Sequence, residues 1–185
     1  MVIREQKMTV EQFDDWVKLP QNAEKLFEFI GGEIVEVPSN PYSSHIGTEI
    51  SFRIKLYLHE RNIDAHVTGE QGGYMVSGNR YAPDVAYLSK AKQAKLVRTG
   101  YNPNPPDLAV EVISPTDADS NITIKVANYL AAGTVVWIVR PETKKVEVYT
   151  PGQPVQQLGE EDTLDGGAVL PEFKLPVKAI FPSEA

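Results

Sequence analysis

The sequence contains no cysteine. This absence excludes disulfides, thiolate nucleophiles and cysteine metal sites together, and it is typical of a reducing compartment. The N-terminus also lacks an apolar signal core, and no stretch approaches the ~20 apolar residues that a membrane span needs. These absences predict a cytoplasmic protein with no membrane partner.

A net positive charge is also missing. The formal net charge is -7, whereas proteins contact the phosphates of nucleic acids mainly through Lys and Arg. The charge is unevenly spread, however, and an approaching backbone responds to the local field. Acidic residues collect near 160–165, and the stretch from Ser89 to Pro106 has no acid but carries Lys90, Lys92, Lys95 and Arg98. This basic segment could hold a phosphate strand, and a solvated surface explains it equally well.

Repeats, linkers and low-complexity tracts are absent as well. The 185 residues include 42% hydrophobic and 23% charged residues, which are ordinary globular values. A chain of this length can bury a core large enough to fold alone. We therefore expect one domain over residues 1–185, in which residues 1–8 form a loose leader.

The most informative stretch runs from Pro106 to Pro115, an apolar segment with one carboxylate, Glu111, in its middle. It predicts a strand covered on both faces, in the centre of a sheet. Side chains alternate along a strand, so Glu111 shares a face with Ala109 and Ile113. A buried, unpaired carboxylate costs several kcal/mol, at least roughly, so Glu111 needs a metal, a proton or a partner.

A second carboxylate, Asp84, follows Pro83 and opens another short apolar run. Two acids on neighbouring central strands can bring their oxygens together at one end of the sheet, where Mg2+ would take a few such ligands beside water and substrate phosphates. In the alternative interpretation Asp84 caps a turn and Glu111 pairs with a basic side chain. Spacing alone does not choose between the two.

Further elements complete an α/β pattern. Thr9 and Gln12 predict a capping box for a short helix, and residues 26–37 alternate around Gly31-Gly32 as in a hairpin that places Glu28 beside the core or on a solvated face. Ser43 or Ser44 is the expected cap of a helix with isoleucines every four residues, and His45 stands at its start.

The second half of the chain follows the same pattern. Residues 67–76 and 81–88 predict two strands joined through residues 77–79, and a helix is expected from about residue 116 to a stop at Gly133. Lys125 flanks the apolar face of that helix. It could serve a site on the sheet, or its amine could simply extend from the apolar surface to solvent.

The residues Pro83-Asp84, Glu111 within Val-Glu-Val-Ile-Ser-Pro, and Lys125 and Tyr129 on the following helix resemble a bacterial family of putative restriction endonucleases in the PD-(D/E)XK nuclease superfamily. The resemblance extends to residues 27–34, His45 and residues 137–139. It implies a restriction-endonuclease-like mixed central sheet with flanking helices and additional β-hairpins. It also implies a homodimer that cleaves phosphodiester bonds in DNA with Mg2+ or Mn2+.

The resemblance assigns roles to individual residues. Asp84 and Glu111 would hold the ion, with the main-chain carbonyl of Val112 as a further ligand, while Glu28 and His45 would border the site. The superfamily pattern places a catalytic lysine two residues after the acid, where this chain has Ile113, and Lys125 is the natural replacement. The departure keeps two other functions open: a binding or regulatory module that has lost catalysis, and a hydrolase of a small phosphorylated molecule.

Overall fold

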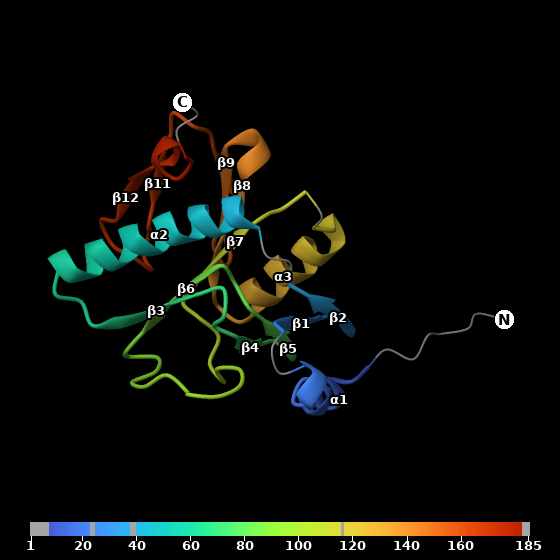
Figure 1. The fold of residues 1–185 in the computed structure, drawn as a ribbon. Coiled ribbons are helices and arrows are strands. Elements are labelled where there is room, and N and C mark those ends of the chain that lie inside the picture. The colour runs from blue at the N-terminus through green and yellow to red at the C-terminus, as the bar shows by residue number, and fades with distance from the viewer. Residues whose placement is uncertain (1–7, 23–24, 38–39, 116, 183–185) are drawn as a thin grey trace.

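A six-stranded sheet with the order β10-β9-β8-β7-β6-β3 forms the centre of the molecule in a computed structural model that describes residues 8–22, 25–37, 40–115 and 117–182 (Figure 1). The parallel pair β7 and β8 is flanked by antiparallel neighbours, so the sheet is mixed. This confirms the predicted fold class. The strands are β3 (Ala65–Gly69), β6 (Val85–Ser89), β7 (Leu108–Val112), β8 (Val135–Arg140), β9 (Lys145–Tyr149) and β10 (Gln156–Leu158).

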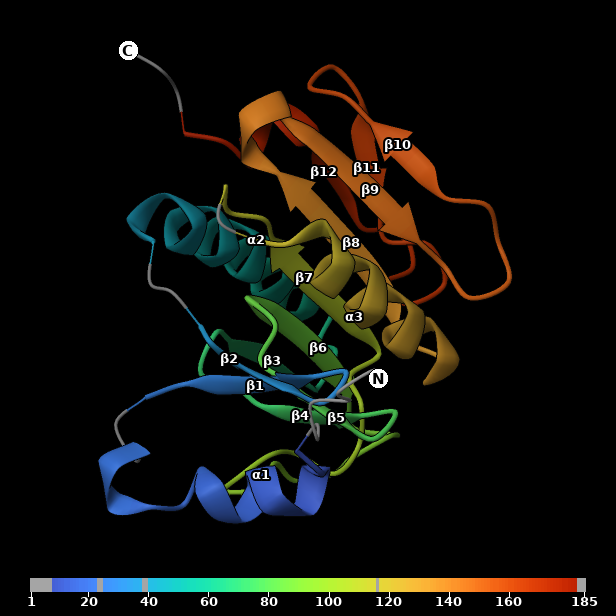
Figure 2. The ribbon, with the colours of Figure 1, turned by 90° about the vertical axis from the view of Figure 1, so that its right-hand side faces the viewer.

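The two faces of this sheet carry different helices because side chains alternate along β7. Leu108, Val110 and Val112 belong to one core cluster, together with the isoleucines of α2 (Pro41–Glu60). Ala109 belongs to the other cluster, with Tyr129 of α3 (Asp119–Ala131). Figure 2 shows β7 between the two helices. The face that carries Glu111 is therefore the face covered by α3.

A second, antiparallel sheet with the order β2-β1-β5-β4 holds the other side of the candidate site. The predicted hairpin around Gly31-Gly32 is confirmed, with positive φ values of 58° and 97° at the two glycines, as a tight two-residue turn requires. The strands are β1 (Phe27–Ile30), β2 (Glu33–Glu36), β4 (Tyr74–Val76) and β5 (Asn79–Tyr81).

The prediction of two long strands over residues 67–76 and 81–88 is wrong. Each is divided between the two sheets: β3 and β6 belong to the central sheet, and β4 and β5 form a hairpin of the second sheet. The breaks fall at Gly72-Gly73, because glycine weakens a strand interior, and at Pro83, which has no N–H to donate. Residues 77–78 join β4 to β5, and the chain returns to the central sheet just after Pro83.

Helix starts were predicted with mixed success. The capping box of Thr9 and Gln12 is confirmed at α1 (Val10–Trp16). The expected Ser43 or Ser44 cap of α2 is wrong, because Asn40 accepts a 2.9 Å hydrogen bond from the Tyr42 amide and Pro41 occupies the first turn. Thr116 and residues 1–7 of the predicted leader lie outside the described residues.

The C-terminal part covers the α2 face of the central sheet. Strands β11 (Thr163–Asp165) and β12 (Lys174–Pro176) pair with each other, and Leu164, Phe173 and Leu175 join the α2 core cluster. Short 3-10 turns lie at Pro20–Asn22, Pro141–Thr143 and Val177–Ala179. Among the described helices, none has the length and apolar character that crossing a bilayer requires.

Candidate active site

Asp84 and Glu111 lie at the same end of the central sheet. Strands β6 and β7 are antiparallel with Val85 opposite Val110, so the residue before β6 and the fourth residue of β7 come together. Asp84 Oδ2 accepts a 2.7 Å hydrogen bond from the Val112 amide, which fixes the carboxylate across the ends of both strands. The predicted adjacency of the two acidic strands is confirmed.

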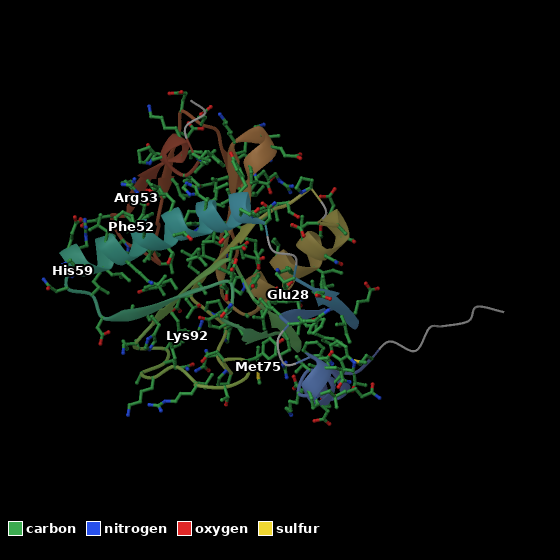
Figure 3. The ribbon with its side chains drawn as sticks, in the orientation of Figure 1. Glu28, Phe52, Arg53, His59, Met75 and Lys92 are labelled. Atoms are coloured by element: carbon green, nitrogen blue, oxygen red, sulfur yellow. The ribbon has the colours of Figure 1, made fainter. Side chains whose placement is uncertain are left out.

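Lys125 reaches this strand end from α3. Its ammonium lies 2.6 Å from Glu111 Oε2 and 2.9 Å from Glu28 Oε1, and all three side chains are buried. The lysine is therefore held between one carboxylate of the central sheet and one of the second sheet. Figure 3 shows Glu28 at its place on β1, near α3. The position two residues after Glu111 is Ile113, which carries no charge. The cation beside Glu111 is instead Lys125 of α3.

Further donors fix both carboxylates. Tyr129, one helical turn after Lys125, donates a 2.9 Å hydrogen bond to Glu111 Oε1, and the Ala82 amide donates a 2.7 Å bond to Glu28 Oε1. The Tyr81 ring centroid lies 5.6 Å from the Lys125 ammonium, within cation–π range. No sequence pattern predicted a role for Tyr81 or for the Ala82 amide. For Tyr129, the i, i+4 spacing from Lys125 was the available signal.

Burial and neighbouring charges, both like and unlike, shift the pKa values of these groups. Burial raises the pKa of Glu111 to about 7, and the repulsion of Glu28 and Asp84 adds to this while Lys125 opposes it. Burial likewise raises the pKa of Asp84 to about 6, against the lowering effect of the Val112 amide and Lys125. Burial alone would lower the pKa of Lys125, but the two glutamates together raise it above its ordinary value. The lysine is therefore a permanent cation at neutral pH.

These side chains face one cavity of about 180 Å3 between the two sheets and the start of α3. Its walls combine the charged groups Glu28, Asp84, Glu111, Asp117 and Lys125 with apolar side chains such as Ile30 and Ile138. His45 does not belong with them, because it is exposed on α2 and lies outside the set of described residues that line the cavity. The helix turns its isoleucines toward the sheet, which leaves position 45 on another side.

The donors in this cavity suit a hard divalent cation. Four carboxylates, those of Glu28, Asp84, Glu111 and Asp117, and one ammonium line it, which leaves a net charge of -3 when all are ionised, and Val112 lines it as well. Within the described ranges, no group of three or more His, Cys, Asp or Glu side chains is arranged to hold a metal. Mg2+ needs only one or two protein carboxylates when water and substrate phosphates complete its shell, so Asp84 and Glu111 fit that ion.

The basic segment after β6 lies away from this cavity. Strand β6 runs from Asp84 toward Lys90, so the two ends are separated by five strand residues, roughly 17 Å. Lys92 is half-buried and pairs with Asp107 at 3.4 Å, and Lys90 lies 3.5 Å from Asp64. Lys95 and Arg98 are exposed. The predicted nucleic-acid contacts of this segment would therefore be made at a distance from the carboxylates.

The mixed sheet and the flanking helices form a fold of the restriction-endonuclease-like class, with two acidic residues at one strand end. Residues 10–178 match the Uma2 family, described as "Putative restriction endonuclease", and the chain belongs to this family. A similar solved structure is that of a putative nuclease belonging to DUF820 from Anabaena variabilis ATCC 29413, with a TM-score of 0.78 and 23% sequence identity over 94% of this chain and 97% of that chain. That likeness concerns the fold. A comparison with curated proteins finds no match.

Proposed function

We propose that this protein is a metal-dependent nuclease that hydrolyses phosphodiester bonds in DNA. The observation that carries the proposal is the position of Lys125, whose ammonium lies 2.6 Å from Glu111 in the cavity that also holds Asp84. An acid pair with an adjacent lysine is thus assembled from three elements, although the strand itself lacks the lysine. Membership of the family supports the same reaction class.

Asp84, Glu111 and the carbonyl of Val112 would hold Mg2+ or Mn2+ in this cavity. When bound, such an ion lowers the pKa of a coordinated water and stabilises charge on the phosphoryl oxygens. The protein prepares for it by burying carboxylates whose pKa values are raised to about 6 and about 7, so a cation relieves an existing cost. The hydrogen bond from Val112 to Asp84 orients one ligand before any ion arrives.

Lys125 acts in this proposal as a fixed positive charge. Because Glu28 and Glu111 raise its pKa, it keeps its proton at neutral pH and cannot serve as the general base. It can donate hydrogen bonds and stabilise the negative charge that develops on the phosphate in the transition state. Glu28, held by the Ala82 amide, positions the lysine.

The second candidate is a binding or regulatory module on the same fold. The contacts of Lys125 with Glu28 and Glu111 also favour this candidate. Two carboxylates already neutralise the lysine, as in an ion pair whose role is only structural. Two further parts of the proposal are a homodimer, which rests on the family resemblance, and a cytoplasmic location, which rests on the lack of cysteine. Sedimentation or light scattering of the pure protein would measure the oligomeric state.

The proposal is tested by incubating supercoiled plasmid DNA with the protein and Mn2+, with EDTA as the blank. The wild type should nick the plasmid, and Asp84→Asn should reduce the rate by orders of magnitude. Asp165→Asn is the matched control, because this aspartate is exposed and pairs with Lys174 on the distant β11–β12 hairpin. Plasmid binding without any cleavage would favour the module, and equal cleavage by Asp84→Asn and the wild type would contradict the assigned site.

A further inference from the structure

A second hollow of about 450 Å3 adjoins the candidate active site on the other side of Asp84. It lies between α2 and the segment that follows β3, and its lining includes Ser44, Phe52, Lys55, Glu70 and Asp84. Figure 1 shows α2 above β3, with the chain turning back between them. The volume is within the range of ligand-binding pockets. Asp84 lines both hollows, so the two adjoin at this carboxylate. We call the second hollow the α2 groove.

The wall formed by α2 is suited to a phosphate backbone. Ser44, Thr48, Ser51 and Lys55 line the groove and recur at intervals of four, three and four residues, so they share one face of the helix. They span about 16 Å of helix, from the rise of 1.5 Å per residue. Hydroxyls and an ammonium are the donors that proteins use toward phosphate oxygens. Lys55 and Thr48 are exposed and available for such contacts.

An aromatic side chain stands on the same wall. Phe52 is 53% exposed, although it lies in the middle of a helix whose isoleucines are fully buried. The guanidinium of Arg53 lies 5.8 Å from the centre of the Phe52 ring, and both side chains project from α2 (Figure 3). An exposed ring beside phosphate donors is the combination with which proteins hold single strands, since the ring stacks on an unpaired base.

Three other residues of the groove lining affect where a bound strand can lie. Gly47 and Gly69 line the groove and have no side chains, which lets a strand approach Asp84 closely. Glu70 lies on the opposite wall and is exposed, so it repels phosphates toward α2. The backbone of a bound strand is thereby confined to the side that carries the hydroxyls and Lys55.

We propose that the α2 groove holds the nucleotides that flank the cleaved phosphate in a single strand of DNA. The inference rests on the proposed nuclease function, because that function places the reacting phosphate beside Asp84. The groove begins at this residue and leads away along α2, so it supplies the binding surface that the small, acidic first cavity does not. Phe52 recognises an unpaired base, Lys55 a phosphate, and Glu70 sets the side on which the backbone lies.

The test measures the binding of a fluorescein-labelled single-stranded DNA of about 16 nucleotides, the upper site size of an OB fold, by fluorescence anisotropy in EDTA at several salt concentrations. Lys55→Gln should weaken binding and reduce the slope of log K against log salt by about 0.7, the value for one phosphate contact of a single strand. Phe52→Ala should weaken binding by at least about fivefold, the lower limit for one stacked base. Glu70→Gln should tighten binding, and its effect should fade as salt rises.

Two control variants accompany these. Leu56→Ala removes an exposed apolar side chain from the same helix, outside the groove lining, and Lys145→Gln removes an exposed cation from β9. Both should bind as the wild type does. If the controls weaken binding as much as Phe52→Ala and Lys55→Gln do, or if no variant differs from the wild type, the groove assignment is overturned.

Cleavage of the same oligonucleotide with Mn2+ is followed in parallel, so that the two proposals fail separately. Cleavage by the wild type with unchanged binding in the groove variants would overturn the groove and leave the nuclease assignment standing. Binding that responds as expected, without cleavage by the wild type, would support the groove and contradict the nuclease. Tighter binding of the RNA oligonucleotide of the same sequence would overturn the choice of DNA.

Discussion

The ammonium of Lys125 lies 2.6 Å from Oε2 of Glu111, although one residue belongs to α3 and the other to β7. The contact depends on the connection between these elements, because the chain leaves β7 at Val112 and enters α3 at Asp119 on the Glu111 face of the sheet. Glu28 then holds the same ammonium from the second sheet. One cation therefore links three elements and compensates two buried acids.

Replacing Lys125 with Met should destabilise the fold by about 3–5 kcal/mol at about pH 8, because Glu28 and Glu111 lose their buried counter-ion. The loss should be smaller at about pH 5, where Glu111 is protonated. Urea unfolding at both pH values measures it. Lys174→Met, which breaks an exposed pair with Asp165, is the control and should cost about 0–1 kcal/mol at either pH. Equal losses in the two variants would contradict a buried network.

The Glu111→Gln variant distinguishes between two roles of Glu111, as a metal ligand and as one partner of a structural ion pair. Lys125 keeps its two contacts with Glu28, so no unpaired buried charge remains and the apo protein should change by no more than about 1 kcal/mol. The rise in Tm with Mn2+ should shrink, because stabilisation follows RT ln(1 + [L]/Kd), and cleavage should fall by orders of magnitude. Glu147→Gln, at an ion pair with Arg140, is the control and should keep the metal response. A large loss of stability with an unchanged metal response would sink the nuclease assignment.

Much of this site could be read from the sequence because strand alternation is a local property. The position of Glu111 on a strand, its face and the neighbouring Asp84 strand all follow from apolar runs of defined period. The hairpin of Gly31-Gly32 followed equally directly from its turn residues. It placed Glu28 on the other face of the strand from Phe27 and Phe29.

The parts that could not be read depend on contacts between distant segments. The bond between Lys125 and Glu28 spans 97 residues, and neither residue has a local feature that names the other. The division of residues 67–88 between two sheets was also hidden, since a β-rich run looks the same whichever sheet it joins. The cap of α2 was missed for a smaller reason, because two serines compete with Asn40 as plausible caps within four residues.

Gly47→Ala should stabilise the protein. Gly47 lies within α2, and an added Cβ would meet Asp84 Cβ at 3.6 Å and Val85 Cγ2 at 3.8 Å, which are ordinary van der Waals contacts. Alanine in a helix interior is favoured over glycine by about 0.5–1 kcal/mol. Thermal unfolding should therefore show a higher Tm, whereas Gly133→Ala should lower it, because Gly133 has a φ of +78° after α3. A fall in Tm for Gly47→Ala would mean that α2 cannot accept even a methyl group beside Asp84.

The exposed cations Lys95 and Arg98 should matter only for long duplexes. They follow the C-terminal end of β6, whereas Asp84 precedes its first residue. The two ends are roughly 17 Å apart along the strand, a distance of about five base pairs at 3.4 Å each. A Lys95→Gln, Arg98→Gln double variant should therefore bind a duplex of about 20 base pairs less tightly, with a smaller salt slope, and bind the short single strand unchanged. Lys92 is unsuitable for this test because it pairs with Asp107. Equal losses for both probes would place these cations at the site itself.

Finally, the raised pKa values predict how pH acts on the protein with and without metal. Asp84 and Glu111 have folded-state pKa values of about 6 and about 7, above their ordinary values of 3.8 and 4.5, so the folded protein binds protons more tightly than the unfolded chain does. Their favourable contribution is complete below about pH 4 and is lost as pH rises to about 7, a decrease on the order of 3 kcal/mol for each group. Because a metal ligand must be deprotonated, Mn2+ should raise the Tm little at about pH 5 and most above about pH 7. Asp84→Asn combined with Glu111→Gln should remove both effects together. Calorimetry across this range measures them, and a metal response that does not change with pH would show that these carboxylates are not the ligands.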